Sequence, residues 1–111
     1  MTSAHPTGDE LLRMLAALAN PQRLRIVAAL TSGRKYVSLL ARELGLSRPL
    51  VHLHLQRLEA VGLVTGSMEV SADGKAMNWY SAVPFDLRIT PEIIAAANPT
   101  LTLNSLGKDS R

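Results

Sequence analysis

Cysteine is absent from this 111-residue sequence, and aromatic residues make up only 4% of it. Without cysteine the chain can form neither a disulfide framework nor a thiolate metal site, which is compatible with a reducing compartment. No apolar run approaches the roughly 18 residues that a membrane helix needs, and the first residues lack the basic and apolar segments of a secretory signal. We therefore expect a soluble, cytoplasmic protein with a single small core.

Acidic residues are fewer than basic residues in this sequence. The chain has 12 Lys and Arg against 9 Asp and Glu, a formal net charge of +3 and a pI of about 9.8. An excess of this sign suits an anionic partner such as nucleic acid. The chain also lacks a glycine-rich phosphate loop and any cluster of acid and base residues, which argues against an enzyme. We expect no catalytic residue, no cofactor and no metal site.

The stretch from Ser47 to Val64 has the pattern of a capped helix, which we expect over residues 47–61. Ser47 can accept an amide hydrogen at the start of the helix, Pro49 lies in the first turn, and Gly62 ends it. One apolar stripe follows from the spacing of Val51, Leu55 and Leu58, whereas more polar side chains lie mostly outside it, namely Arg48, His52, Gln56 and Arg57.

A shorter helix is predicted just upstream, over residues 39–44, with Ser38 as its N-cap and Gly45 as its end. Two helices joined by residues 45–47 form a helix-turn-helix. In such a motif the second helix lies in the major groove of DNA.

Two more helices are predicted before this motif. Residues 1–8 look like a flexible tail, and residues 10–19 form a helix that is apolar almost all round. That helix packs either wholly inside its own subunit or partly against a second protomer, and we favour the second arrangement for Leu11, Met14, Leu15 and Leu18. Asn20-Pro21 then opens a core helix that is expected to place Leu24, Val27 and Ala28 on one face, with Ile26 and Leu30 close beside it.

Alternating apolar residues follow the helix-turn-helix and predict strands over residues 63–71 and 75–83. Asp73-Gly74 between them is typical of a tight hairpin, and such a hairpin is the wing of a winged helix. Lys75 is expected to contact phosphate, although Glu69 and Asp73 should weaken the contact of the wing. Trp79 and Tyr80 lie on opposite faces, so one of them packs on the core. Arg34 and Lys35 form a small basic loop that either touches phosphate or faces water.

The C-terminal part, residues 86–111, is predicted to contain a short helix over about 91–97 and a flexible tail. Ile93 and Ile94 in this helix could pack on a partner protomer. The predicted organisation is therefore a tail over 1–8, a winged helix-turn-helix domain over 9–85 and this C-terminal segment. The predicted fold class is mainly α with a β-hairpin wing.

Three motifs in this order resemble the ArsR/SmtB family of bacterial winged-helix repressors: residues 18–26 (LANPQRLRI), 40–47 (LARELGLS) and 51–55 (VHLHL). The resemblance covers about residues 10–85. It implies a homodimer that binds a palindromic operator and represses transcription, often releasing DNA when a small effector binds. The cysteine pair of metal-sensing members corresponds here to Tyr36 and Ser38, and no histidine follows His54. We therefore expect a member that does not sense metals, and any effector is of another kind.

His52 and His54 point about 200° apart on a helix, so they cannot chelate one ion. The resemblance implies that His54 packs behind the recognition helix, whereas His52 is expected to contact DNA. Leu50 and Leu53 are exposed by helical phase and either contact a thymine methyl or simply flank the interface.

The predicted function is a sequence-specific transcriptional regulator that binds double-stranded DNA. Arg48 and Gln56 would hydrogen-bond to base edges, and Ser47, Arg57 and Lys75 would hold phosphates. The full predicted interface is Ser47, Arg48, Pro49, Leu50, His52, Leu53, Gln56, Arg57 and Lys75. The alternative is a winged helix that binds a partner protein through Leu50 and Leu53, and an enzyme ranks below both.

Overall fold

The computed structural model describes residues 6–103, which belong to two compact units that are treated separately below. One unit is continuous, from residue 17 to residue 85, and the other combines the segments before and after it. We expected the winged-helix domain to begin at residue 9, but the compact unit begins at residue 17. Among the described residues, no helix is both long enough and apolar enough to cross a membrane.

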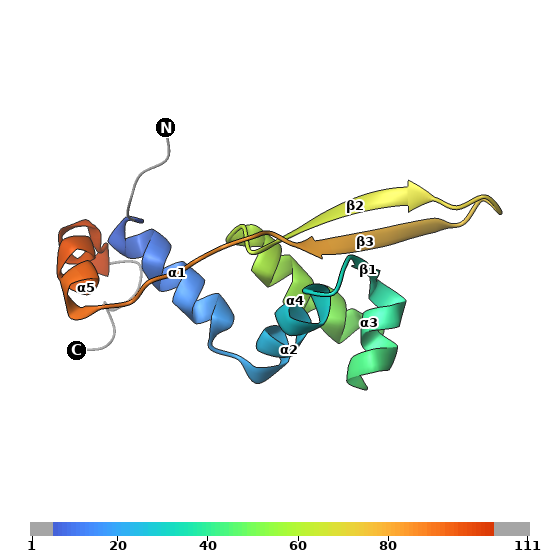
Figure 1. Ribbon diagram of the computed structural model, residues 1–111, viewed down its shortest axis with the longest axis horizontal. Helices are drawn as coiled ribbons and strands as arrows, with labels where there is room; N and C mark the ends of the chain where they lie inside the picture. Colours follow the sequence, from blue (N-terminus) through green and yellow to red (C-terminus); the bar gives the residue numbers. More distant parts are fainter. Residues whose placement is uncertain (1–5, 104–111) are drawn as a thin grey trace. The chain divides into compact units, whose positions relative to one another are not determined.

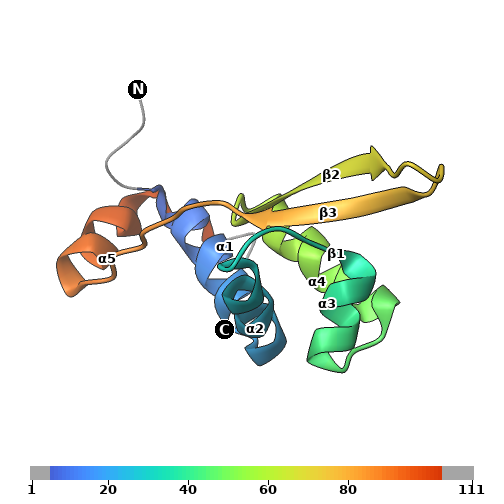
Figure 2. The same ribbon diagram turned by 45° about the vertical axis from the view of Figure 1, so that its right-hand side comes forward.

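Residues 17–85 form the winged helix-turn-helix, so the predicted α+β fold class is confirmed. Its elements are α2 (Pro21–Leu30), β1 (Lys35–Tyr36), α3 (Val37–Leu44), α4 (Arg48–Ala60), β2 (Val64–Val70) and β3 (Ala76–Ala82). The three strands pair antiparallel in the order β1-β3-β2. Figures 1 and 2 show the β2–β3 hairpin extending as a long arm beyond the helices, as a wing does.

The core of this unit lies between the helices and the inner end of the sheet. The stripe of Val51, Leu55 and Leu58 on α4 is fully buried, as predicted. The other fully buried side chains are Ile26, Leu40, Leu63 and Val64, and Tyr80 is buried beside them. The predicted core face of α2 was wrong in part, because Leu24 is 53% exposed, whereas the neighbouring Ile26 and Leu30 are the side chains that α2 buries.

Most helix ends follow the local signals in the sequence. The side chain of Asn20 accepts hydrogen bonds from the amides of Gln22 and Arg23 at 2.9 and 3.1 Å. Ser47 Oγ accepts from the Leu50 amide at 3.3 Å, with Pro49 in the first turn of α4. Gly45 has the left-handed conformation, with φ of 69°, that lets the chain turn between α3 and α4.

Ser38 was wrongly predicted as the N-cap of α3. The helix begins two residues earlier than predicted, at Val37, and its N-cap position is Tyr36, which makes no side-chain capping bond. The reason is the short strand β1, in which Tyr36 pairs with Trp79 of β3. This pairing holds Tyr36 in an extended conformation, so the helix starts directly after it.

The second unit contains residues 8–16 of α1 (Gly8–Leu18), together with α5 (Pro91–Ala97) and the 3-10 turn η1 (Asn98–Thr100). Helix α5 has the predicted bounds, and Thr90 Oγ1 accepts from the Ile93 amide at 3.0 Å. Helix α1 begins with a reciprocal capping box, in which the Thr7 and Glu10 side chains each accept the other's backbone amide hydrogen.

Hydrogen bonds join the start of α1 to the residues after α5. The Gly8 amide donates to Thr100 Oγ1 at 2.6 Å, and the Thr102 amide donates to Asp9 Oδ1 at 2.8 Å. Gly8, Thr100 and Thr102 were all expected in flexible tails, and the structure places them in this network instead. The rest of those expected tails, residues 1–5 and 104–111, lies outside the described residues.

Candidate nucleic-acid interface

The side of α4 that faces away from the core is exposed. Val51, His54, Leu55 and Leu58 are buried on one side of the helix. At 100° per residue, the opposite side carries Pro49, Leu53, Gln56 and Ala60, with Arg48 and His52 on one flank and Leu50 and Arg57 on the other. Of the residues predicted on this helix, all are exposed except His52, which is half-buried, and Ser47 at its N-cap is exposed too. An α-helix with one free side has the size that the major groove of DNA accommodates.

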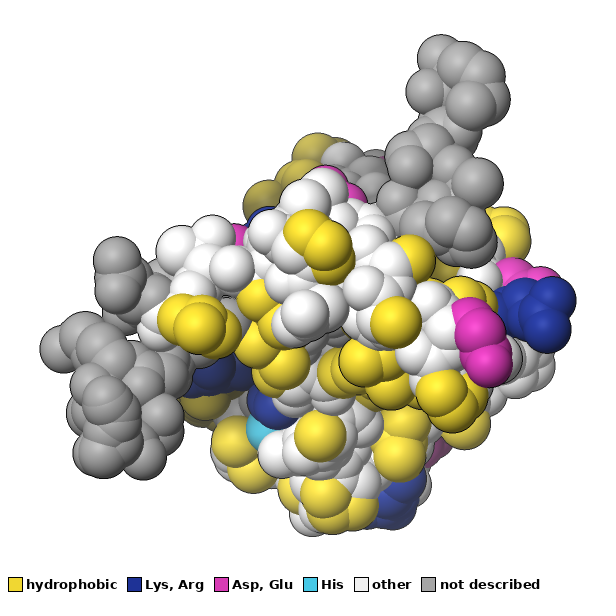
Figure 3. Space-filling view, turned by 90° about the vertical axis from the view of Figure 1, so that its left-hand side faces the viewer, with side chains coloured by type: hydrophobic (Ala, Val, Ile, Leu, Met, Phe, Trp, Pro, Cys, Tyr) yellow, Lys and Arg dark blue, Asp and Glu magenta, His cyan; other side chains and the backbone are white. Residues whose placement is uncertain are grey.

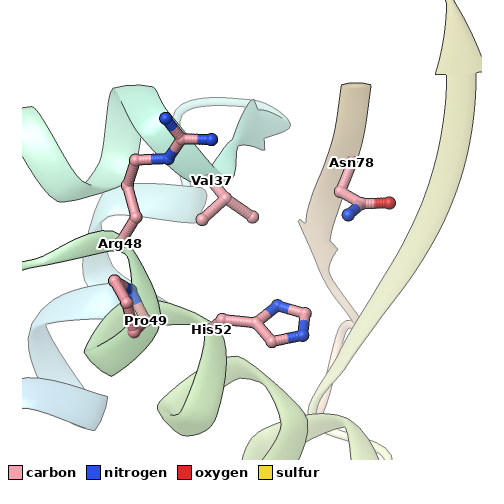
Figure 4. A pocket seen from close by; sticks show the side chains of 5 residues that line it. All are labelled: Val37, Arg48, Pro49, His52 and Asn78. Carbon is pink, nitrogen blue, oxygen red and sulfur yellow. The ribbon is translucent and has the colours of Figure 1, made fainter. Parts of the chain in front are cut away.

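An open hollow of about 500 Å³ lies between the first turns of α4 and the wing. It is lined by Arg48, Pro49 and His52 of α4, by Val37 of α3 and by Asn78 of β3. Figure 4 shows the His52 ring extending toward β3, while Arg48 reaches toward α3. The sequence analysis missed Asn78, although strand alternation places it on the same face as the buried Tyr80 two residues later.

The loop residues Arg34 and Lys35 are held by carboxylates of their own chain. Arg34 forms a two-pronged ion pair with Glu69 at 2.5 and 3.1 Å, and its guanidinium lies 4.2 Å from the centre of the Trp79 ring. Its hydrogen bonds hold the pKa of the Glu69 carboxyl below its usual value. Lys35 pairs with Glu43 at 3.3 Å. Both cations of this loop therefore form ion pairs within the protein, and the Arg34 side chain remains 46% exposed to water.

The tip of the wing leaves one cation free of ion pairs. Asp73 accepts hydrogen bonds from the Ser71 hydroxyl and from the Lys75 amide, which keep the pKa of its carboxyl below the usual range. The Lys75 side chain is exposed and makes no ion pair with any residue from 6 to 103. The guanidinium of Arg34 already neutralises the charge of the Glu69 carboxylate. The wing should therefore repel DNA phosphates less strongly than its sequence suggested.

Positive charge is concentrated in residues 17–85, which hold eight Lys and Arg against four Asp and Glu. Five of these cations are exposed and form no ion pair within the described part of the chain: Arg25, Arg42, Arg48, Arg57 and Lys75. Arg25 instead donates hydrogen bonds to the Gln22 side chain and to the Leu44 carbonyl. Arg42 lies in the last turn of α3 and was missed by the sequence analysis. Its position in the first helix of the helix-turn-helix is the signal that could have identified it, because that helix crosses the DNA backbone.

His54 is buried behind α4, where it is 7% exposed. Arg23 Nη1 of α2 lies 3.2 Å from His54 Nδ1, and Arg23 Nε donates to the carbonyl of Ala17 at 2.5 Å. A guanidinium only donates hydrogen bonds, so Nδ1 accepts and the neutral ring carries its proton on Nε2. Burial lowers the pKa of His54 below its ordinary value, and the charges of Arg23 and Arg57 lower it further.

Stability should therefore fall in acid because of His54. The unfolded chain binds a proton at this ring near pH 6.5, whereas the folded chain binds it only at lower pH. The stabilising contribution is complete above pH 6.5 and is lost as the pH falls through the lowered pKa. Urea unfolding at about pH 7.5 and about pH 5 should show a smaller loss for His54→Gln than for the unaltered chain. Equal losses in the two proteins would contradict this role, since His5 and His52 are common to both.

The residues predicted at a dimer interface differ in exposure. Leu11 is only 5% exposed, whereas Ile94 is 50% exposed. The remaining members, Met14, Leu15, Leu18 and Ile93, are half-buried. Leu12 and Ile89, which the sequence analysis omitted, are exposed as well. Figure 3 shows hydrophobic side chains gathered over the visible face, with few charged ones among them.

Together these features define a winged helix-turn-helix DNA-binding protein. Residues 20–65 match the family model described as the arsR family of bacterial regulatory proteins. The HTH-type transcriptional regulator MJ0229 of Methanocaldococcus jannaschii is 39% identical over 85 residues, which span 77% of this chain and 88% of that relative. The chain therefore belongs to the ArsR family, whose members are transcriptional regulators and not enzymes.

Other relatives agree with this assignment. CmtR of Mycobacterium tuberculosis is 46% identical over 59 residues, which span 53% of this chain and 50% of CmtR. The structure of reduced HlyU from Vibrio cholerae is 25% identical, with a TM-score of 0.59 and coverage of 91% of this chain and 92% of HlyU. The homodimeric winged helix-turn-helix domain of Mb0332 from Mycobacterium bovis has a TM-score of 0.61 over 82% of this chain and 74% of that one, and at 24% identity it supports the fold alone.

Proposed function

We propose that this DNA-binding regulator is a homodimeric repressor that binds a palindromic operator through α4. The observation that carries the proposal is the free outer side of α4 within a unit where Arg42, Arg48, Arg57 and Lys75 are exposed and lack ion-pair partners among residues 6–103. A repressor of this kind would occupy its operator and block transcription. One α4 from each protomer would enter successive major grooves, about 34–36 Å apart.

Distinct side chains would position the protein and select the sequence. Arg48 and Gln56 would hydrogen-bond to base edges, because a guanidinium matches guanine and a carboxamide matches adenine. Arg57, Lys75 and Ser47 would hold phosphates, and Arg42 is added to this set by its exposure on α3. Ser47 Oγ accepts from the Leu50 amide, which leaves its hydroxyl hydrogen available to a phosphate oxygen.

The second protomer would pack against α1 and α5. Exposed Ile94 on α5 and Leu12 on α1 support this choice, since both are large apolar side chains left open in the single chain. The homodimer described for Mb0332 gives the same expectation. Sedimentation at micromolar concentration tests it, and a monomer that still binds one full palindrome would overturn it.

The effector of this regulator, if it has one, would not be a metal ion held by cysteine. The positions that match the family's cysteine pair carry Tyr36 and Ser38. From residue 6 to residue 103, no group of three or more His, Asp and Glu side chains could hold a metal ion together. A small molecule of another class is the effector that we propose.

Salt dependence distinguishes DNA binding from the alternative, a winged helix that binds a partner protein. Arg42, Arg57 and Lys75 would give a dimer six cations on phosphates, so affinity for a selected duplex should fall about a thousandfold between about 50 and 200 mM salt. The measurement is fluorescence anisotropy with a duplex enriched from a random pool. Failure to bind or enrich any duplex at low salt would favour the protein-binding alternative, whose apolar contact should hardly respond to salt.

A further inference from the structure

The outer side of α4 carries more apolar surface than hydrogen bonding to bases requires. Leu50 and Leu53 are 38% and 43% exposed, and Pro49 beside them is also exposed. Gln56 lies one turn beyond Leu53 on the same side, while Arg48 and Arg57 flank this surface. The helix therefore presents two leucines between cations that would hold it close to DNA.

Only one group on the floor of the major groove offers a leucine side chain favourable apolar packing. Every base edge there presents hydrogen-bond donors, acceptors or both, and thymine alone adds a methyl group, at C5. A leucine pressed against polar edges would desolvate them without replacing their hydrogen bonds, which is unfavourable. A leucine packed on a thymine methyl instead removes apolar surface of both partners from water.

We propose that Leu53, together with Leu50, recognises thymine methyl groups, so that thymine in each half-site is selected by packing and not by hydrogen bonding. This inference rests on the proposed function and specifies the base that the apolar part of α4 selects. Gln56 would hydrogen-bond to an adenine close to these thymines, because its side chain follows Leu53 along the same side of the helix. A partner protein is the competing occupant of this surface, but the flanking arginines and the excess positive charge of residues 17–85 favour the polyanion.

Methyl scanning of a duplex enriched from a random pool tests the proposal. Each thymine is replaced in turn by deoxyuridine, which keeps every hydrogen-bonding group of the base and removes only the methyl. Binding should weaken about fourfold for each contacted thymine, the amount expected for losing one buried methyl group. Replacing the symmetry-related pair in both half-sites should therefore weaken binding about sixteenfold.

The alanine variants assign the effect to particular side chains. Leu53→Ala should bind the thymine and deoxyuridine duplexes with nearly equal affinity at the position that Leu53 contacts, and Leu50→Ala should do so at its own position. Gln56→Ala is the matched control, because it removes an exposed side chain of the same helix and should keep the methyl preference while binding more weakly. Circular dichroism verifies that each exposed substitution leaves the fold intact.

The possible results separate this inference from the proposed function. If no duplex binds at low salt, the proposed function itself fails, and a partner protein becomes the better occupant of the leucines. If a duplex binds but no deoxyuridine substitution weakens binding, the function stands and the methyl contact is refuted. A methyl preference that survives in both leucine variants also refutes the assignment to these residues.

Discussion

Replacing Leu58 with alanine is expected to lower the free energy of unfolding by about 2–5 kcal/mol. The Leu58 side chain is completely buried on the inner side of α4, which packs against α2 and β2. Truncation removes buried apolar atoms and leaves a cavity that the surrounding helices fill only in part. Since a small domain is stable by only about 5–15 kcal/mol, much of the population should unfold at low denaturant concentration. Urea titration followed by circular dichroism measures the change.

Two variants of α4 serve as controls for Leu58→Ala. Leu58→Met keeps most of the side-chain volume and should cost less than about 1.5 kcal/mol. Gln56→Ala alters an exposed position two residues away and should change stability by no more than about 0.5 kcal/mol. A Leu58→Ala protein as stable as Gln56→Ala would contradict the burial of this side of α4.

Local signals predicted the elements that depend on nearby residues. Asn20-Pro21, Ser47 with Pro49, and Thr90-Pro91 cap their helices within a few residues, so the starts of α2, α4 and α5 could be inferred from short segments. Asp73-Gly74 likewise predicted the turn of the wing. The capping box of Thr7 and Glu10 is equally local, and its pattern in the sequence was overlooked.

Contacts between distant segments produced the errors. Strand β1 has only two residues and exists because β3, more than forty residues later, pairs with it. The same pairing displaced the predicted cap of α3 from Ser38. The ion pair of Arg34 with Glu69 spans 35 residues, so the sequence alone could not show that this cation is engaged. In α2 the periodicity allowed two adjacent faces, and packing selected the one with Ile26 and Leu30.

The candidate interface could be predicted only in part, because helical periodicity places some of its residues and contacts between distant segments place the others. Helical phase alone places Gln56 and Leu53 opposite the buried stripe of α4, and the structure shows both exposed. Asn78 joins Arg48 and His52 only because the wing folds back beside α4. A side chain contributed by another element in this way needs the tertiary structure before it can be assigned.

Replacing Arg48 with alanine is expected to weaken binding to the selected operator by about 1–3 kcal/mol, or roughly 5- to 150-fold. Arg48 lies at the start of α4, is exposed, and makes no ion pair within residues 6–103. A guanidinium that hydrogen-bonds to both acceptors of a guanine discriminates against the other bases. The variant should therefore lose preference at one base pair of each half-site, measured by comparing operators that carry each of the four bases at that pair.

Lys75→Ala provides the contrast that separates selection of sequence from attraction to phosphate. A lysine on a phosphate contributes equally to every sequence, so its loss should weaken all of these operators alike and reduce the salt slope by about one per protomer. Arg48→Ala should instead weaken the preferred operator most and leave the poorest one nearly unchanged. If Arg48→Ala lowered all affinities by the same factor, Arg48 would hold phosphate beside the hollow that it shares with His52 and Asn78, and Gln56 would be the remaining candidate for hydrogen bonding to a base.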